Sequence, residues 1–125
     1  RVHVLEKTNA RHLAWGDLNP TPAIVVTDVS FISLEKILPA AVAVCGDSLE
    51  WVVSLIKPQF EAGRAQVGRG GVVRDPAVHD EVCERIRSFG ESELGLNCRD
   101  IIPSPLKGPK GNIEFLAWWE PQSAP

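Results

Sequence analysis

The sequence predicts an α/β protein, in which helices pack in layers against a sheet. Runs of β-branched and apolar residues alternate with helix-like segments along the 125 residues. One of these runs, at residues 23–27, is continuously rich in β-branched residues, which is typical of a strand buried on both faces in a parallel sheet. The last two runs are separated only by a Pro/Gly-rich stretch and predict a hairpin-like pair.

The first half of the chain supports two strands and a helix. Residues 2–5 predict a short strand that ends in a polar loop, followed by a helical turn within residues 9–18. Residues 23–27 form the second strand. Ser33 is a suitable N-cap for a helix over residues 34–44, which Pro39 is expected to kink.

The second half predicts three more strands and one long helix. Residues 50–56 form a strand, after which Pro58 keeps Lys57 out of the helical region. A long loop with four glycines is expected at residues 59–74. Asp75 caps a helix over residues 76–93, which Gly95 closes. Strands at residues 96–102 and 113–119 follow, on either side of a loop at 104–112. Residues 1–120 then form one domain, and 121–125 a frayed tail.

The composition favours an ordinary cytoplasmic protein. No apolar run is long enough to cross a bilayer, and no secretory leader opens the chain. The three cysteines lie far apart, which predicts reduced thiols and no metal site. The net charge of −3 does not indicate nucleic-acid binding, so any RNA contact must come from local basic segments or from another domain. One such segment contains Arg64, Arg69 and Arg74. A second contains Lys107 and Lys110.

Asp28 and Lys57 are the first candidates for chemistry. Each follows a predicted strand, and ligands of open α/β sheets bind beyond the carboxyl ends of the strands. The two side chains are therefore expected to meet at one edge of the sheet. Together, a carboxylate and an amine can activate a hydroxyl group. The alternative is a structural ion pair, and the pattern favours the functional interpretation only slightly.

Other candidates leave more than one interpretation open. Glu114 enters an apolar strand, so it either lies on an exposed face, which the pattern favours, or points into a site. The glycine-rich residues 63–71 could surround an anion or form a mobile lid, and they match neither a dinucleotide turn nor a phosphate loop. The three histidines are scattered and interpreted as structural. The four tryptophans, Trp15, Trp51, Trp118 and Trp119, are interpreted as core or interface residues.

Four contiguous motifs carry a family resemblance. The segments TDVSFISLEKILPA, LIKPQFEAG, VGRGGVVRDPAVH and SPLKGPKGNIEFLAWW resemble the TlyA or haemolysin A-like family, within the wider FtsJ/RrmJ-type RNA ribose methyltransferases. The resemblance covers residues 4–119. It implies a Rossmann-like fold that uses S-adenosylmethionine to methylate a ribose 2′-hydroxyl of ribosomal RNA, typically at cytidine. Ribosomal RNA or ribosomal subunits are the implied partners.

The resemblance also assigns site residues. The family's catalytic Lys-Asp-Lys-Glu set places its aspartate at Asp28, its second lysine at Lys57 and its glutamate at Glu114. Glu6, Thr8 and Asn9 correspond to the adenosine side of the cofactor site, with Asn9 the best hydrogen-bonding candidate, and Asp28 borders the methionine side.

The remaining family features are expected upstream of Arg1. These are the first lysine, the first two strands, the glycine-rich cofactor loop and a small RNA-binding domain of the ribosomal-protein S-four type. The absence of methionine and the strand at the first residues also predict a chain truncated at its N-terminus. We therefore expect the chain alone to be inactive and to bind S-adenosylmethionine weakly. The two missing strands normally lie between the strands at residues 2–5 and 23–27. A gap or a rearranged edge is therefore expected there, with exposed apolar surface or pairing to another molecule.

Two other functions were weighed. A non-catalytic RNA-binding or ribosome-assembly module could keep the same fold, but three of the four expected catalytic residues are present. A membrane-active haemolysin would need an amphipathic basic helix or a spanning segment, and the sequence predicts neither.

Overall fold

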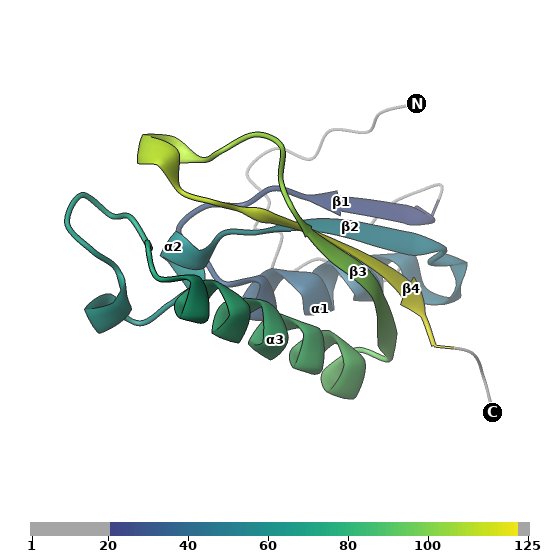
Figure 1. Ribbon diagram of the computed structural model, residues 1–125. Coiled ribbons are helices and arrows are strands. Elements are labelled where there is room, and N and C mark those ends of the chain that lie inside the picture. The colour runs from purple at the N-terminus through teal and green to yellow at the C-terminus, as the bar shows by residue number, and fades with distance from the viewer. Residues whose placement is uncertain (1–20, 123–125) are drawn as a thin grey trace.

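The computed structural model describes residues 21–122, which form an α/β arrangement of one sheet and three α-helices (Figure 1). The elements follow one another as β1 (Ile24–Thr27), α1 (Leu34–Cys45), β2 (Trp51–Ile56), α2 (Pro58–Glu61), α3 (Pro76–Glu93), β3 (Leu96–Pro103) and β4 (Phe115–Pro121). The predicted strand at 2–5, the helical turn at 9–18 and the candidates Glu6, Thr8 and Asn9 lie outside the described residues.

The sheet has the strand order β1-β2-β4-β3. Strands β1 and β2 are parallel and in register from Ile24 opposite Trp51 to Thr27 opposite Ser54. Strand β4 runs antiparallel to both of its neighbours, so β3 and β4 form the predicted hairpin-like pair. The helices lie on one side of the sheet (Figure 1). The ends of β1 and β2, helix α2 and the loops after it gather at the left end of that view.

Both helix starts are confirmed by side-chain caps. The Ser33 hydroxyl accepts a hydrogen bond from Glu35 N, and the Asp75 carboxylate accepts one from Ala77 N. Helix α1 continues through Pro39 to Cys45. Gly95 has a φ of +65°, a conformation that favours glycine at the end of a helix.

Two predicted boundaries were wrong. Residues 58–61 form helix α2 and not the start of a loop, because Pro58 occupies the first helical position after an extended Lys57. Strand β4 begins at Phe115, not at residue 113, and runs on to Pro121. Its later end is explained by pairing with β3, which continues to Leu96 opposite Pro121.

The core lies between the sheet and helices α1 and α3. It contains Leu34, Leu38, Val52, Ile56, Val73, Val78, Val82, Ile86, Leu96, Ala117 and Trp119. Trp119 is fully buried, and its indole N–H donates to Ser54 Oγ at 3.0 Å. Its ring also rests against Gly90 of α3, where an added β-carbon would lie 2.3 Å from Trp119 Cζ3. Of the other tryptophans predicted as core or interface residues, Trp51 and Trp118 are partly exposed, and Trp15 lies outside the described residues.

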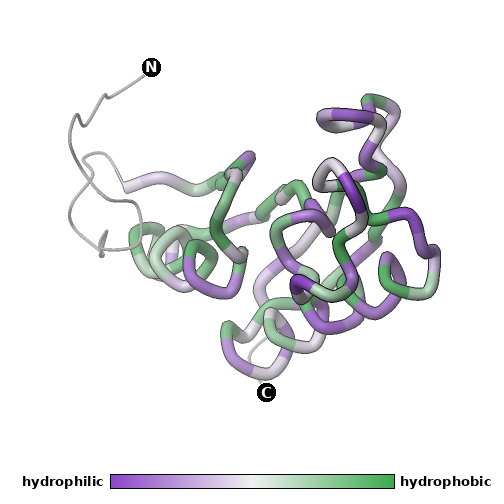
Figure 2. Tube along the Cα trace, turned by 90° about the vertical axis from the view of Figure 1, so that its left-hand side faces the viewer, coloured by the Kyte–Doolittle hydropathy of each residue, from purple (hydrophilic) through white to green (hydrophobic). Residues whose placement is uncertain are grey.

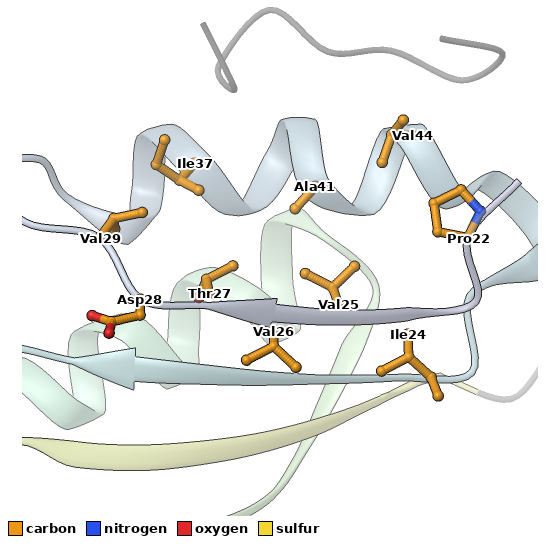
Figure 3. A pocket seen from close by; sticks show the side chains of 10 residues that line it. All are labelled: Pro22, Ile24, Val25, Val26, Thr27, Asp28, Val29, Ile37, Ala41 and Val44. Atoms are coloured by element: carbon orange, nitrogen blue, oxygen red, sulfur yellow. The ribbon is translucent and has the colours of Figure 1, made fainter. Parts of the chain in front are cut away.

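The expectation that β1 is buried on both faces was wrong. Ile24 is 46% exposed and Val26 is 71% exposed. Both point away from α1, whereas Val25 and Thr27 point toward it (Figure 3). Within residues 21–122, β1 pairs only with β2, so its outer edge has no neighbouring strand. The expected gap involves the predicted strand at residues 2–5, which lies outside the described residues.

The contact between Gly90 and Trp119 gives a stability prediction. Alanine normally favours a helix over glycine by about 1 kcal/mol, but here its methyl group would meet a buried indole ring. We expect Gly90→Ala to lower the free energy of unfolding by about 2 kcal/mol, in the range for overpacked cores. Ser88→Ala, at an exposed position of the same helix, should change it by less than about 0.5 kcal/mol. Urea denaturation of both variants measures the difference, and equal stabilities would contradict the packing argument.

Candidate active site

Asp28 and Lys57 meet at the carboxyl end of the parallel strand pair. Lys57 Nζ lies 2.5 Å from Asp28 Oδ1. The two side chains differ in exposure, with 12% of the Lys57 side chain and 64% of the Asp28 side chain accessible to solvent. Lys57 Nζ also donates to Ser30 Oγ at 3.3 Å. An ammonium group has three N–H donors, so two acceptors leave one donor for a ligand.

Two residues near this pair in the sequence carry buried oxygen atoms without partners. Within residues 21–122, the buried side-chain oxygens that lack a hydrogen bond are Thr27 Oγ1 and Gln59 Oε1. Thr27 directly precedes Asp28, and Gln59 follows Lys57 by two residues. A buried polar atom without a partner costs free energy, so its presence needs an explanation such as a ligand that completes the hydrogen bond.

Glu114 is buried, which corrects the expectation from its sequence pattern that it lies on an exposed face. It is 7% exposed, and its Oε2 accepts a hydrogen bond from Gln59 Nε2 at 2.8 Å. Its carboxylate also rests against Gly108, where an added β-carbon would lie 2.1 Å from Glu114 Oε2. The pattern failed because the loop before β4 folds back over this carboxylate.

Glu114 lies close to the Asp28–Lys57 pair along the sheet. The last paired residues of β2 and β4 are Ile56 and Phe115, so Lys57 and Glu114 are the next residues along the same register. Within the described residues, Lys57 forms an ion pair with Asp28 but not with Glu114. Gln59 therefore connects the lysine-bearing segment to Glu114, a role that the sequence analysis did not identify.

A buried carboxylate, Glu61, holds the two halves of the site together. Its side chain is 2% exposed and accepts hydrogen bonds from Ser33 Oγ at 2.7 Å, Leu34 N at 2.8 Å and Arg85 Nη2 at 2.8 Å. Arg85 also donates to the Glu61 carbonyl and to Glu35 Oε1. These contacts join the start of α1, just after Asp28, to α2, just after Lys57. The sequence offered one signal for this network, a glutamate directly after an apolar residue in a short Pro-initiated turn.

The turn between β1 and α1 has an unusual backbone. Phe31 has a φ of +63°, which is rare for a bulky residue, and its side chain is 88% exposed. Its ring lies 4.6 Å from that of Phe60 in α2, measured between centroids. The aromatic contact therefore adds a second link between the two segments that carry Asp28 and Lys57.

Beside Asp28, a hollow of about 400 Å³ opens between β1 and α1 (Figure 3). Its walls are mainly apolar, and Asp28 lies at one end of it. The residues that line it are Pro22, Ile24, Val25, Val26, Thr27, Asp28, Val29, Ile37, Ala41 and Val44. Among these, the Asp28 carboxylate and the unpartnered Thr27 hydroxyl are the polar side-chain groups.

The remaining ionisable candidates have structural roles or no role in the site. The buried His79 ring forms a 2.9 Å hydrogen bond with Val73 O, as expected for a structural histidine. The three cysteines are free. Burial, aided by nearby Asp80, raises the pKa of the Cys83 thiol to about 11, so this thiol is a poor nucleophile at neutral pH.

Comparison with known proteins identifies the family. The sequence pattern of FtsJ-like methyltransferases matches residues 1–120. The chain belongs to the FtsJ-like methyltransferase family. Its relatives include the 16S/23S rRNA (cytidine-2′-O)-methyltransferase TlyA of Mycobacterium tuberculosis, 43% identical over 123 residues, and Hemolysin A of Brachyspira hyodysenteriae, 41% identical over 122 residues. The TlyA resemblance is thereby confirmed.

A solved structure supports the same assignment. The crystal structure of a hemolysin-like protein from Lactococcus lactis is 42% identical and superposes with a TM-score of 0.86, which confirms the predicted methyltransferase fold. The matches cover 98%, 94% and 96% of this chain but 45%, 48% and 57% of the Mycobacterium, Brachyspira and Lactococcus proteins. The chain thus spans about half the length of the curated relatives it matches. No helix within residues 21–122 of this FtsJ-like chain is long and apolar enough to span a membrane.

The Glu61 network gives a second stability prediction. In Glu61→Ala, Leu34 N loses its buried acceptor and Arg85 loses its carboxylate partner. We expect the free energy of unfolding to fall by about 2–3 kcal/mol, with most of the loss due to the unsatisfied buried amide. Glu84→Ala is the control, because Glu84 forms an exposed 3.7 Å ion pair with Arg87 on α3. Such a pair contributes less than about 1 kcal/mol. Similar losses in both variants, measured by chemical denaturation, would rule out the proposed role of Glu61.

Proposed function

We propose that the full-length protein methylates a ribose 2′-hydroxyl of ribosomal RNA, with Lys57 as the group that acts on the attacking hydroxyl. The observation that carries this proposal is the contact between Lys57 and Asp28 at the carboxyl ends of adjacent parallel strands. Ligands of open α/β sheets bind at this edge. Family membership supports the reaction class, and the printed activity of the Mycobacterium relative supports the RNA and the position on the ribose.

Lys57 suits this role because its position is strongly restricted. Its side chain is largely buried, and Nζ is held by Asp28 and by Ser30. The remaining N–H donor can hydrogen bond to the ribose 2′-oxygen, and the ammonium charge stabilises the negative charge that develops as that oxygen loses its proton. Lys57 thereby acts either as the cation that favours hydroxyl ionisation, with the proton passing to water, or, in its neutral form, as the base that accepts this proton.

Asp28 and Glu114 are proposed to position the reacting groups. Asp28 fixes Lys57 directly, whereas Glu114 orients Gln59, whose own Oε1 is buried without a partner. A ribose hydroxyl can donate a hydrogen bond to that oxygen. Because methyl transfer requires an in-line approach of oxygen to carbon, this kind of orientation should contribute much of the rate enhancement.

The described residues fit only one end of S-adenosylmethionine. The hollow beside β1 is mainly apolar, but the exposed Asp28 carboxylate at its end suits the cationic methionine portion of the cofactor. When bound, the cofactor supplies an electrophilic methyl group. Glu6, Thr8 and Asn9 remain the proposed contacts for the adenosine side. They lie outside the described residues.

The target and location follow from the relatives. We propose cytidine as the methylated nucleoside and ribosomal RNA or a ribosomal subunit as the partner, as in the name of the Mycobacterium relative. Because ribosomes are assembled and act in the cytoplasm, this is also the proposed location.

Substitutions of Lys57 test the mechanism. In the full-length protein, Lys57→Ala should reduce single-turnover methylation of ribosomal RNA by about a hundredfold or more, the scale of acid–base assistance. Cofactor affinity, measured by calorimetry, should change little, since Lys57 acts on the attacking hydroxyl. Lys57→Arg should not restore the rate, because a guanidinium is bulkier and does not lose its proton in this pH range. A near-normal rate in Lys57→Ala would make the ion pair purely structural.

Glu114→Gln removes the negative charge of Glu114 but keeps an oxygen that can orient Gln59. The amide can still hydrogen bond to Gln59, so we expect a rate loss smaller than that of Lys57→Ala. Glu120→Gln is a suitable control, because Glu120 lies at the far end of the same strand in an exposed 3.7 Å ion pair with Arg99. If both substitutions leave the rate unchanged, Glu114 has no part in the reaction.

A further inference from the structure

We propose that the two loops flanking Glu114 form one phosphate-binding surface that holds the RNA strand beside the Asp28–Lys57 pair. The arginine loop comprises residues 62–74 and the lysine loop comprises residues 104–112. Neither loop contains an aspartate or glutamate. Together they carry Arg64, Arg69, Arg74, Lys107 and Lys110, all of which are exposed. This inference rests on the proposed function, because it assigns the RNA-contacting surface of the same site.

A buried asparagine joins the two loops. Asn112 is 3% exposed, and its Oδ1 accepts a hydrogen bond from Val73 N at 3.0 Å. Its Nδ2 donates to Gly71 O at 3.0 Å and to Pro109 O at 3.1 Å. One side chain therefore connects both loops. The glycine-rich residues 63–71 are thus attached to the lysine loop through Asn112.

The joined loops bring Lys110 against the arginine loop. A β-carbon at Gly70 would lie 4.0 Å from Lys110 Nζ, so the lysine reaches across to the arginine loop. Lys110 has a φ of +59°, a left-handed conformation that is unfavourable for lysine. Figure 1 shows both loops at the same end of the molecule, and this end faces the viewer in Figure 2.

The surface adjoins the candidate active site. Gly108 of the lysine loop contacts the Glu114 carboxylate, and Ser104 N donates to Glu114 O at 2.8 Å. Glu114 in turn is hydrogen bonded to Gln59, two residues after Lys57. An RNA backbone that lies on the loops would therefore pass the site where Lys57 meets the ribose.

The distribution of charge favours a polyanion. The chain as a whole has a net charge of −3, but these two loops contribute five positive charges and no negative ones. Other exposed arginines are neutralised locally, since Arg85, Arg87 and Arg99 each form an ion pair with a glutamate. Within the described residues, the five loop cations form no such pair. Free cations clustered in loops suit the repeated phosphates of a nucleic-acid backbone.

The test compares two double variants of the full-length protein that lose the same charge. Arg69→Gln with Lys110→Asn removes one cation from each loop, and asparagine tolerates the left-handed backbone of position 110. Arg87→Gln with Arg99→Gln is the control, because both arginines are exposed and ion-paired outside the loops. Binding of protein-free ribosomal RNA and of ribosomal subunits is measured as a function of salt. Cofactor affinity and unfolding temperature are measured in parallel.

We expect the loop variant to bind protein-free RNA roughly tenfold more weakly near 0.15 M salt, with cofactor affinity and unfolding temperature unchanged. If both cations contact phosphates of single-stranded RNA, the logarithmic salt slope should fall by about 1.4. The control should remain within about twofold of the unmodified protein, because both of its arginines lie outside the loops and are neutralised by glutamates.

Several results distinguish this inference from the proposed function. RNA binding and a salt slope equal to those of the control would overturn the inference, even if Lys57→Ala abolishes methylation. Weakened binding to ribosomal subunits but not to protein-free RNA would also overturn it, because the loops would then contact a ribosomal protein. A further possible result is that the full-length protein transfers no methyl group while the loop variant still loses RNA binding as predicted. That result would support the phosphate-binding surface and refute the proposed methylation reaction.

Discussion

The Glu61 carboxylate is the constraint on which the candidate site depends. It takes hydrogen bonds from the start of α1 and from Arg85 of α3, while its own backbone belongs to α2. Helices α1 and α2 each begin shortly after a candidate catalytic residue, so this one group restrains both segments. Burial makes the restraint strong, since a carboxylate with a 2% exposed side chain is stable only if its oxygens are well paired. The Glu61–Arg85 ion pair thus restrains the segments that carry the candidate catalytic residues, although it takes no part in the proposed chemistry.

The register of the sheet then determines which side chains can react together. Because Thr27 pairs with Ser54, the parallel strands β1 and β2 end near one another, and Asp28 and Lys57 emerge at the same edge. The antiparallel β4 brings Glu114 to that edge from the opposite direction. Three elements from separate parts of the sequence therefore converge, and two residues close to them in the sequence, Thr27 and Gln59, carry buried oxygens without hydrogen-bond partners.

Two exposed surfaces within the described residues adjoin the candidate site, and they differ in polarity. The outer edge of β1 and the hollow beside it are apolar, and they end at Asp28. The loops held by Asn112 are basic and exposed, and they end at Glu114. The candidate site lies between an apolar region and a cationic one. This arrangement agrees with a reaction in which the protein mainly positions an anionic RNA strand next to a separately bound methyl donor.

The sequence by itself determined the elements whose causes are local. Ser33 and Asp75 predicted the helix starts correctly, because a cap needs only its own first turn, and the meeting of Asp28 and Lys57 followed from the geometry of parallel strands. Only the tertiary structure decided which polar groups are buried. Glu114 and Glu61 are both buried glutamates, yet their partners are 55 and 24 to 28 residues away in sequence. The exposure of β1 likewise depends on which segments pack beside it. Burial is set by contacts between distant segments, and no local pattern of residues records which segments those will be.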